Sequence, residues 1–416
     1  MTFKRVVITG AGALTPIGNT LSEYWEGLRN GKSGAAPITK FDTTLFKTKF
    51  ACELKGFDPE KFMERKEARK LDPFSQYALV ASDEAIKDAN LPMTEINLDR
   101  VGVIWGSGIG GLLTFQEEMR SFAAGDGTPR FNPFFIPKMI PDLSAGHISI
   151  KHGFRGLNYV TVSACASSTN AMYDAYTYLK LGKADIIVSG GSEAAICIAG
   201  VGGFNALKAL SENNSSPETA SRPYDKNRDG FVLGEGAGAL ILEEYEHAKR
   251  RGAKIYAEII GGGMSSDAYH ITAPHPGGAG IIKVMEYALE EAGIKPEEVD
   301  YINTHGTSTP LGDVGEIKAI QKVFGEHAYK LNISSTKSMT GHLLGAAGGI
   351  EAIACLLAIK EGIVPPTINH FTDDPELDPR LNLTFHKAQK REVNIALSNT
   401  FGFGGHNCSI LLKKVQ

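Results

Sequence analysis

The sequence predicts an α/β fold built from two similar halves. Short runs rich in β-branched and other apolar residues alternate along the chain with longer segments of helical periodicity, and this alternation is typical of α/β proteins. Several of the short runs are apolar at consecutive positions, as expected of strands whose sheet is covered by helices on both faces. A glycine-rich segment followed by an apolar run also occurs twice, near the middle and at the end of the chain.

The predicted elements follow one another in the order that this fold requires. An apolar run at residues 6–8 leads into a glycine-rich segment, and a helical pattern follows at residues 21–29. The other predicted helices cover residues 74–89, 166–181, 281–292, 314–324 and 346–360. The other predicted strands cover residues 101–105, 159–163, 186–189, 239–242, 255–260, 301–303, 331–334, 393–397 and 409–412.

The duplication is visible in two pairs of segments. Residues 231–244 and residues 401–414 both read as a glycine-rich turn that feeds an apolar strand. At nearly the same offset, the strand before Ala164-Cys165 matches the strand before Ser335-Thr336-Lys337. Two such halves meeting back to back would bring their polar loops into one shared site. We place the boundary between Arg251 and Lys254, which gives an N-terminal half of residues 1–253 and a C-terminal half of residues 254–416.

The composition is that of a soluble globular protein. Apolar residues make up 42% of the chain and charged residues 22%, and the net charge of −4 gives no indication of a nucleic-acid binder. No apolar run reaches the roughly 18 residues that a membrane helix needs, and the N-terminus enters a strand without room for a signal peptide. The five cysteines are far apart and form no C-x-x-C pair. This pattern predicts reduced thiols in the cytoplasm and no zinc site.

A dinucleotide cofactor is not predicted. The segment Thr9-Gly-Ala-Gly-Ala-Leu-Thr-Pro-Ile-Gly18 resembles the G-x-G-x-x-G fingerprint only in part, because the third glycine would fall at Thr15. Pro16 would also disturb the helix that should hold the pyrophosphate, and no acidic residue ends a second strand about 20 residues later. We therefore predict a tight glycine turn and no cofactor.

Cys165 lies where a predicted strand ends and a helix begins. A thiol at a helix N-terminus meets the positive end of the helix dipole, which favours the thiolate. Small neighbours, among them Ser163, Ala164 and Ala166, leave space for a substrate to reach the sulfur. Position alone leaves open that Cys165 is a small buried apolar residue, which is our interpretation of Cys52, Cys197, Cys355 and Cys408.

Other candidate groups lie in polar segments of the second half. His305 follows a strand in Asn303-Thr-His-Gly-Thr-Ser-Thr, and His342 lies in a polar loop that leads into a helix of small residues. Taken singly, each histidine could be structural. Lys337 lies in the same loop as His342, among apolar and small residues. The turn Phe401-Gly-Phe-Gly-Gly-His-Asn407 offers backbone N–H groups without obstructing side chains, which an oxyanion hole requires.

Together these motifs resemble the β-ketoacyl-acyl carrier protein synthases of the type II elongating branch. The likeness covers essentially the whole chain, in the family's order Cys, His, Lys, His, Phe. It implies the thiolase fold, in which two like halves form a five-layer α-β-α-β-α sandwich, and a homodimer. It also implies acyl- and malonyl-loaded acyl carrier protein as partners, with no nucleic acid and no membrane insertion.

The resemblance assigns a role to each candidate. Cys165 would hold the acyl chain as a thioester, with the backbone N–H groups of Cys165 and Phe403 as the oxyanion hole. His305 and His342 would donate to the malonyl thioester oxygen and stabilise the enolate that decarboxylation leaves. This enolate would attack the acyl group in a Claisen condensation that extends a fatty acid by two carbons. Lys337 would orient the site electrostatically, and the Phe403 ring would gate acyl entry.

Further residues would contact the substrate and the carrier protein. Thr307 and Thr309 would hold the phosphopantetheine arm, and Ile109, Phe134 and Phe204 would wall the acyl pocket. Because the carrier protein is acidic, its docking face should be basic, with Lys66, Arg69, Lys70, Arg130 and Lys208 as candidates. The family also suggests a monovalent cation near Asn303, Glu351, Ser398 and Asn399, although we predict no catalytic metal.

Two departures leave the substrate preference open. The nucleophile turn reads Ser-Ala-Cys-Ala-Ser-Ser where the family more often has Thr-Ala-Cys-Thr, and His406 stands where threonine is usual. Neither change removes a catalytic group, but synthases of polyenes and polyketides share the same core, so a ketosynthase of that kind is the alternative. A degradative thiolase, a type III initiating synthase and a non-catalytic partner subunit that sets chain length fit less well.

Overall fold

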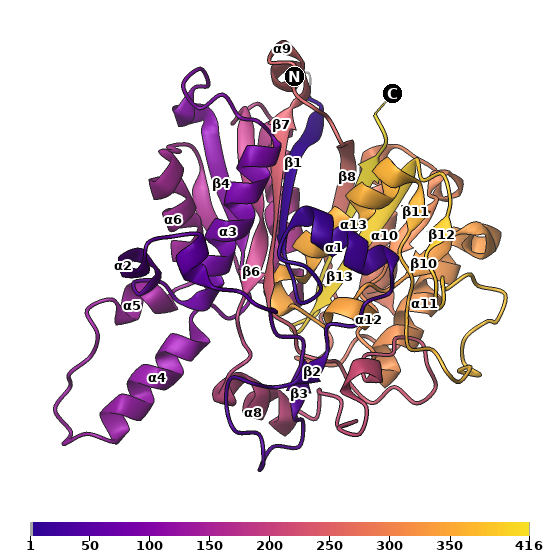
Figure 1. Ribbon diagram of the computed structural model, residues 1–416. Helices are drawn as coiled ribbons and strands as arrows, with labels where there is room; N and C mark the ends of the chain where they lie inside the picture. The colour runs from indigo at the N-terminus through magenta and orange to yellow at the C-terminus, as the bar shows by residue number, and fades with distance from the viewer. Residues whose placement is uncertain (1–2, 416) are drawn as a thin grey trace.

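The computed structural model describes residues 3–415, whose main strands form one continuous sheet (Figure 1). Its order is β10-β9-β13-β14-β8-β1-β7-β6-β4-β5. The N-terminal half contributes β1 (Val6–Leu14), β4 (Val101–Gly106), β5 (Asn158–Thr161), β6 (Ile186–Glu193) and β7 (Gly236–Glu244). The C-terminal half contributes β8 (Ala257–Ser266), β9 (Tyr301–Asn303), β10 (Asn332–Ser334), β13 (Ile395–Gly402) and β14 (His406–Lys413).

The two halves repeat one another strand for strand. In the first half β4 pairs in parallel with β5 and β6, and β7 is antiparallel to both β6 and β1. In the second half β9 pairs in parallel with β10 and β13, and β14 is antiparallel to both β13 and β8. The halves meet where β1 and β8 pair, with Val6 opposite Ile259. The predicted duplication is therefore confirmed, including the match of residues 231–244 with residues 401–414.

The helices lie in three layers that the two halves of the sheet separate. One outer layer holds α3 (Pro73–Asp88) and α6 (Leu143–His152), and the other holds α10 (Ala279–Ala292) and α11 (Pro310–Phe324). The central layer holds α7 (Ser167–Lys180) and α13 (Ala347–Glu361), with α1 (Leu21–Arg29) beside them. The remaining helices and strands are short or peripheral: α2 (Arg65–Ala68), α4 (Leu112–Ala123), α5 (Phe135–Met139), α8 (Ile198–Ala206), α9 (Tyr245–Arg250), α12 (Lys337–Thr340), β2 (Ala36–Pro37), β3 (Phe50–Ala51), β11 (Ile363–Val364) and β12 (Gln389–Lys390).

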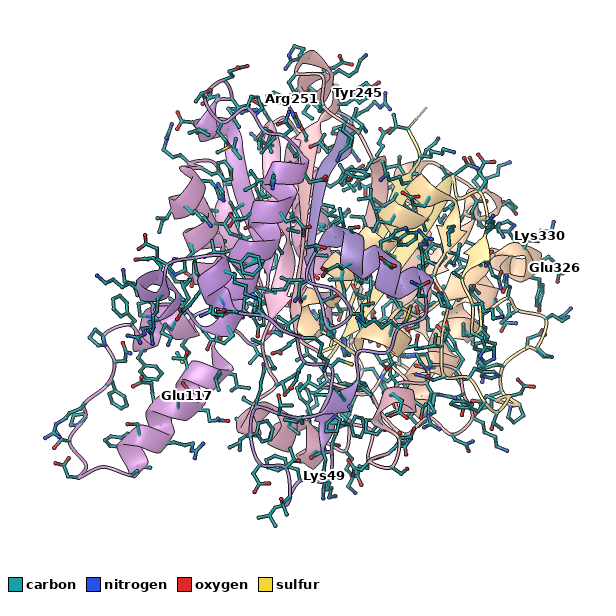
Figure 2. The ribbon with its side chains drawn as sticks, viewed as in Figure 1. Lys49, Glu117, Tyr245, Arg251, Glu326 and Lys330 are labelled. Carbon is teal, nitrogen blue, oxygen red and sulfur yellow. The ribbon has the colours of Figure 1, made fainter. Side chains whose placement is uncertain are left out.

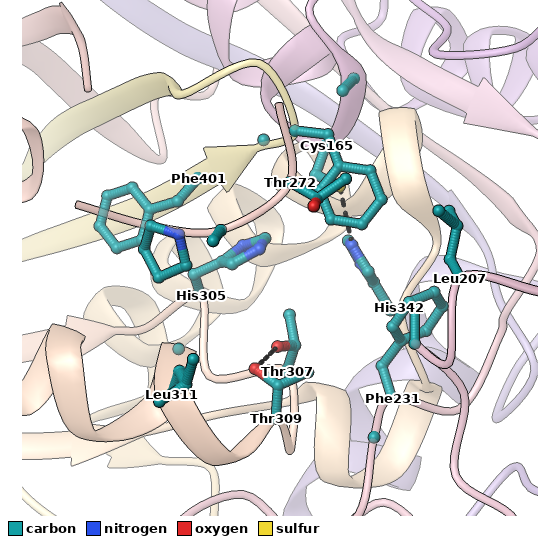
Figure 3. A pocket seen from close by; sticks show the side chains of 18 of the residues that line it. Cys165, Leu207, Phe231, Thr272, His305, Thr307, Thr309, Leu311, His342 and Phe401 are labelled. Carbon is teal, nitrogen blue, oxygen red and sulfur yellow. Dashed lines mark hydrogen bonds between the residues drawn. The ribbon is translucent and has the colours of Figure 1, made fainter. Parts of the chain in front are cut away.

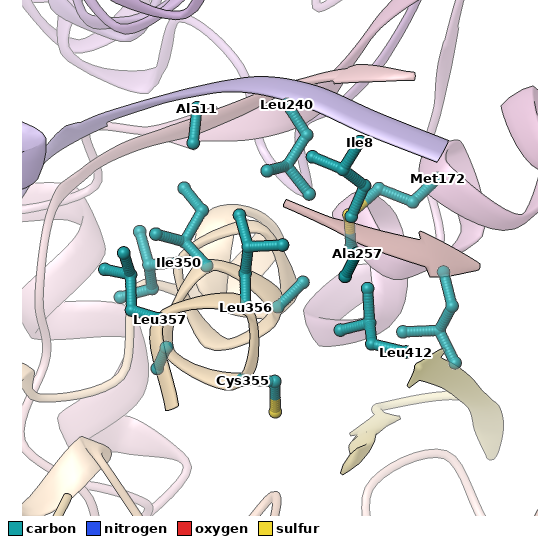
Figure 4. Packing of buried hydrophobic residues seen from close by; sticks show 14 of the residues in the cluster. Ile8, Ala11, Met172, Leu240, Ala257, Ile350, Cys355, Leu356, Leu357 and Leu412 are labelled. Atoms are coloured by element: carbon teal, nitrogen blue, oxygen red, sulfur yellow. The ribbon is translucent and has the colours of Figure 1, made fainter. Parts of the chain in front are cut away.

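The core lies mainly around α13 in the central layer. Every residue of α13 from Ala347 to Ile359 is buried, as expected of a helix that is apolar on all sides. Its Ile350, Leu356 and Leu357 belong to the same cluster as Leu240 and Leu412 of the two halves of the sheet (Figure 4). This packing confirms the predicted five-layer α-β-α-β-α sandwich.

The first glycine-rich segment differs from its prediction. The structure has no turn at Gly10 and Gly12, because β1 continues through both to Leu14. A Cβ atom at Gly12 would lie 2.1 Å from the carbonyl oxygen of Ala81 in α3. Glycine is needed there because a helix crosses the strand at close range. The chain turns only afterwards, where Thr15 and Gly18 bridge.

The segment that connects the halves is anchored to the N-terminal sheet. Figure 2 shows Arg251 beside Tyr245, the first residue of α9. Arg251 donates through Nε and Nη2 to the two carboxylate oxygens of Glu243, both at 2.7 Å, and His247 Nδ1 lies 2.6 Å from Oε1 of the same carboxylate. Glu243 is fully buried in β7. The halves share one sheet and one central core, so their division at residue 253 stays a prediction.

The α4–α5 region is the most exposed part of the N-terminal half. In Figure 1 α4 extends away from the sheet, and Phe115, Phe122, Phe131 and Phe134 in this region are all exposed. Within residues 3–415, no helix is long and apolar enough to cross a membrane.

Candidate active site

A cavity of about 640 Å³ lies between the two halves and takes lining residues from both. Cys165 comes from the first half, and His305 and His342 come from the second (Figure 3). Ile109, Phe204, Lys208, Thr307, Thr309 and Phe403 also line the cavity. The structure thus gathers most of the residues that the sequence singled out.

The Cys165 turn places the thiol at the wall of this cavity. Residues 164–166 form a single 3₁₀ turn between β5 and α7, and Ala164 adopts a left-handed backbone with φ of 51°. The second half repeats this geometry at Leu344, with φ of 48°, just before α13. The counterpart of Cys165 is therefore Gly345. The predicted match of the two strands is confirmed, because β5 and β10 are the equivalent edge strands of the two halves. The loops after them differ, since α12 and a further loop lie between β10 and the turn at Leu344.

The two histidines face the sulfur. His342 Nε2 lies 3.0 Å from Cys165 Sγ, and the rings of His305 and His342 are nearly perpendicular with centroids 5.3 Å apart. Cys165 Sγ and one ring nitrogen of each histidine lie within 4.8 Å of one another. A nucleophile and two imidazoles thus share one small volume that a substrate can enter.

Both histidines are neutral. Burial, together with the charge of Lys337, holds the pKa of each imidazole well below its usual range. The Nδ1 atoms of His305 and His342 are buried and have no hydrogen-bond partner within residues 3–415. Because buried N–H groups without an acceptor are rare, we assign the ring protons to Nε2. In this tautomer His342 donates to the Cys165 sulfur, and its donor faces the cavity.

The Cys165 thiol is also neutral. Burial raises its pKa to about 12, although the charge of Lys337 and the backbone N–H of Phe403 act in the opposite direction. Burial therefore opposes the thiolate that the helix N-terminus favours.

Lys337 acts on the site from behind the cavity wall. It opens α12, is almost fully buried, and forms an ion pair with Glu351 of α13. Its ammonium group is not among the groups that line the cavity. Its influence on Cys165 and the two histidines is therefore electrostatic.

The glycine-rich turn between β13 and β14 lies against the nucleophile. A Cβ atom at Gly402 would lie 2.8 Å from the Ser163 carbonyl oxygen and 3.1 Å from the Cys165 nitrogen. Only glycine allows this approach, which brings the Phe403 N–H to the sulfur. His406 begins β14 and is exposed.

Other predicted residues take different positions. Thr307 and Thr309 point into the cavity with their hydroxyl oxygens 3.0 Å apart (Figure 3). Phe134 lies outside this cavity, on the exposed segment before α5. Four of the candidate docking residues are exposed: Lys66, Arg69, Arg130 and Lys208. The fifth, Lys70, is half-buried and forms an ion pair with Glu67.

The sequence analysis missed a buried carboxylate beside His305. Glu316 of α11 accepts hydrogen bonds from the backbone nitrogens of His305 and Gly306, both at 2.9 Å. Burial raises the pKa of Glu316 to about 7, against the effect of these N–H groups. The signal was an acidic residue between Val314 and Ile317 in an apolar helical pattern.

The suggested cation site has suitable atoms. Asn303 Oδ1, Glu351 Oε2 and Ser398 Oγ are buried oxygens without a hydrogen-bond partner among the described residues. Asn399 differs, because its Oδ1 accepts from Ser409 Oγ at 2.7 Å. Hard cations prefer oxygen ligands, so the first three residues fit such an ion.

Comparisons with known proteins agree on one family. The family profiles "Beta-ketoacyl synthase, N-terminal domain" and "Beta-ketoacyl synthase, C-terminal domain" match residues 3–248 and 256–371. The chain is 51% identical over 415 residues to a Synechocystis sp. protein named 3-oxoacyl-(acyl-carrier-protein) synthase 2, with 99% of each chain covered.

The solved structures that resemble this chain also include β-ketoacyl synthases and ketosynthases. A β-ketoacyl synthase from Burkholderia phymatum STM815 is similar with a TM-score of 0.91 and 36% identity, over 99% of this chain and 100% of that one. This chain is also similar to a chain of the solved complex between a type II polyketide synthase acyl carrier protein and its ketosynthase. The TM-score is 0.90 and the identity 34%, over 100% of each chain.

Proposed function

The chain belongs to the β-ketoacyl synthase family, and from this premise we propose how its cavity works. The chain is a β-ketoacyl-acyl carrier protein synthase, an acyltransferase of fatty acid biosynthesis that condenses malonyl-acyl carrier protein with an acyl chain. The observation that carries the assignment of roles is the convergence of Cys165 Sγ with a nitrogen of His305 and of His342 within 4.8 Å.

Cys165 accepts the acyl chain. Its sulfur attacks the acyl thioester, a new S–C bond forms, and the carrier's thiol leaves. The exchange balances, because the Cys165 thiol loses one proton and the leaving thiol gains one. The N–H groups of Cys165 and Phe403 stabilise the oxyanion, a role supported by the approach of Gly402 to the nucleophile turn.

His305 and His342 then act on the malonyl group. Their Nε2–H groups donate to the thioester oxygen while the bond to the carboxylate breaks and CO₂ leaves as the enolate forms. The enolate carbon attacks the acyl-Cys165 carbonyl, the new C–C bond forms, and the sulfur leaves and regains a proton. Neutral imidazoles suit this role because the charge that they stabilise exists only in the transition state and the intermediate. Their lowered pKa values keep them neutral.

The remaining residues orient the reactants. Thr307 and Thr309 hold the phosphopantetheine arm with hydroxyl groups that point into the cavity. Lys337 shapes the electrostatics of the site through its ion pair with Glu351. A monovalent cation held by Asn303, Glu351 and Ser398 would supply positive charge next to that pair.

Acyl carrier protein is the partner, and a ketosynthase of similar structure has been solved in complex with one. We propose that it docks on the basic residues Lys66, Arg69, Lys70, Arg130 and Lys208. The greater identity to a 3-oxoacyl-(acyl-carrier-protein) synthase 2 (51%) than to a polyketide ketosynthase (34%) favours the fatty acid reaction. A location in the cytoplasm stays a prediction.

We also propose a homodimer. The edge strand β5 has no neighbour on its outer side within residues 3–415, and the exposed phenylalanines of the α4–α5 region lie in the same half of the chain. Phe134 does not reach the cavity of its own chain, so it would wall an acyl pocket only across such an interface. Size-exclusion chromatography with light scattering tests this proposal, and a monomer at assay concentration refutes it.

Acyl loading tests the reaction itself. The protein is incubated with acyl carrier protein that carries a fatty acyl group, and the digested peptides are analysed by mass spectrometry. We expect the acyl mass on the Cys165 peptide and its absence from Cys165→Ala. Acylation elsewhere, or no acylation of a folded protein, refutes the proposal.

A further inference from the structure

A second missed carboxylate lies directly behind the wall of the cavity. Glu193 is the last residue of β6 and is fully buried. No lysine, arginine or histidine within residues 3–415 forms an ion pair with it. It is bound instead by backbone N–H groups and one hydroxyl. A buried charge of this kind is costly unless every acceptor site is used.

The contacts of Glu193 reach two separate segments of the active site. Oε2 accepts from the nitrogens of Gly108 at 2.8 Å and Gly345 at 3.0 Å. Oε1 accepts from the nitrogens of Ile109 at 3.2 Å and Gly110 at 3.3 Å, and from Ser107 Oγ at 3.3 Å. Every backbone N–H of residues 108–110 is therefore donated to this one side chain.

The backbone approaches the carboxylate so closely that a side chain would not fit at Gly345 or Gly108. A Cβ atom at Gly345 would lie 2.7 Å from Oε2 and 2.2 Å from the Gly108 nitrogen. A Cβ atom at Gly108 would lie 2.9 Å from Oε2 and 3.3 Å from the carbonyl oxygen of Ala164, which precedes the nucleophile. Glu193 thus lies where the cavity-wall loop, the Cys165 turn and the turn after His342 meet.

Glu193 holds the middle of this loop, whereas the end of the loop is held by the hydrogen bond from the Gly111 nitrogen to the carbonyl oxygen of Met139 at 2.9 Å. Ile109 lines the cavity and is flanked by Gly108, Gly110 and Gly111, which have no side chains to pack. Gly110 adopts φ of 75°, in the left-handed region. The position of the Ile109 side chain therefore depends on hydrogen bonds to its backbone, and these end on Glu193.

We propose that Glu193 is a positioning residue for acyl-chain selection, which holds Ile109 at a fixed place relative to the catalytic turns. This inference rests on the proposed function and deepens it. Burial raises the pKa of Glu193 to about 7, even though four backbone N–H groups act to lower it. A carboxylate kept at such a cost in place of an apolar residue is consistent with a functional role.

Glu193→Gln removes the restraint selectively. The amide has one accepting oxygen, and its NH₂ group can be accommodated only where Ser107 Oγ can accept from it. That orientation keeps the bonds from Gly108 and Gly345 and breaks those from Ile109 and Gly110. The Ile109 loop is released, whereas the turn after His342 keeps its support.

A double-mutant cycle with Ile109→Phe tests the coupling. In the otherwise unchanged protein, the larger side chain should slow acylation by long chains at least about fivefold relative to short chains, because it overpacks a fixed wall. When Ile109→Phe is combined with Glu193→Gln, the loop can move away from the larger side chain. The slowing of long chains relative to short chains should then fall below about threefold, since the effects of coupled neighbours are not additive.

Glu84→Gln is the matched control. Glu84 also accepts two backbone N–H bonds, from Ala13 and Leu21 at 2.8 Å each, but it does not line the cavity. Glu84→Gln should leave unchanged the extent to which Ile109→Phe slows acylation by long chains relative to short chains. The proposal is overturned if Ile109→Phe slows long chains relative to short chains equally with and without Glu193→Gln. It is also overturned if Glu193→Gln lowers activity uniformly over all chain lengths.

Hydrogen exchange on the unaltered protein provides a test that does not depend on a variant that folds. The amides of residues 108–110 should exchange slowly although they lie outside any helix or strand, and rapid exchange would overturn the inference. If the unaltered protein forms no acyl-Cys165, the proposed function itself fails. Normal condensation without the predicted coupling refutes only the role of Glu193.

Discussion

Lys337→Met is expected to change the titration of the catalytic histidines. Methionine is of similar length but has no charge, so the substitution removes one of the causes that lower the pKa of His305 and His342. Burial remains, so both pKa values should rise only part of the way toward 6.5. A nearby positive charge disfavours the protonated imidazole, so removal of the Lys337 charge should raise both pKa values.

The direction in which the pH–rate profile moves depends on which protonation state of His305 and His342 is active. The histidines donate as neutral imidazoles with the proton on Nε2, so the rate falls as the pH drops through their pKa. Removal of Lys337 raises that pKa and therefore moves the acid limb of the decarboxylation profile to higher pH. Acylation should also slow, because the charge of Lys337 lowers the pKa of the Cys165 thiol.

Stability has to be separated from catalysis in this experiment. Removal of one partner from a buried ion pair costs about 3–5 kcal/mol, and Lys337→Met leaves Glu351 without its partner. The double variant Lys337→Met/Glu351→Leu removes both charges and should recover most of this loss in the free energy of unfolding, measured with denaturant. Malonyl decarboxylation is then followed against pH in both variants. An unchanged acid limb in a folded variant would refute the electrostatic role of Lys337.

The other predictions separate the two half-reactions and the choice of chain length. Cys165→Ala should abolish condensation but retain decarboxylation of malonyl-acyl carrier protein, because His305 and His342 donate without the sulfur; a folded variant that loses both activities would contradict this. His305→Ala and His342→Ala should each lower decarboxylation by about 10²–10³-fold while Cys165 still accepts an acyl group, and normal malonyl turnover would remove that histidine from the mechanism. Ile109→Phe should slow acylation by long chains about fivefold to over a hundredfold, from an overpacking cost of about 1–3 kcal/mol, and leave short chains nearly unaffected; equal slowing at all lengths would mean that Ile109 is not the wall.

Much of the fold could be predicted from the sequence because its strands are covered on both faces. Consecutive apolar residues mark β6 and β7 without ambiguity, and the glycine-rich entry to β7 recurs at β14. The second half adds α12 and a loop before the turn at Leu344. Such an insertion shifts the alignment of the halves without a local signal, which explains why Gly345 was not recognised as the counterpart of Cys165.

The candidate site was predictable only where its residues lie in polar loops or match the family's motifs. Cys165, His305 and His342 met both conditions, and in the structure all three line the same cavity. Glu193 and Glu316 met neither, because most of their partners are backbone N–H groups, which leave no pattern in a sequence. The one signal at Glu316 was its place in an apolar helical pattern. Phe134 illustrates a different limit, since it lies outside the cavity of its own chain and would wall the acyl pocket only in the homodimer that we propose.

The central claim is that one thiol carries the acyl chain from which the new C–C bond is made. The most direct measurement loads the protein with a labelled acyl group, removes the free carrier, adds malonyl-acyl carrier protein and follows both species by mass spectrometry. We predict that the label leaves the Cys165 peptide at the rate at which labelled β-ketoacyl-acyl carrier protein, two carbons longer, is formed. Product formed while the label stays on Cys165, or formed by Cys165→Ala, would contradict the account.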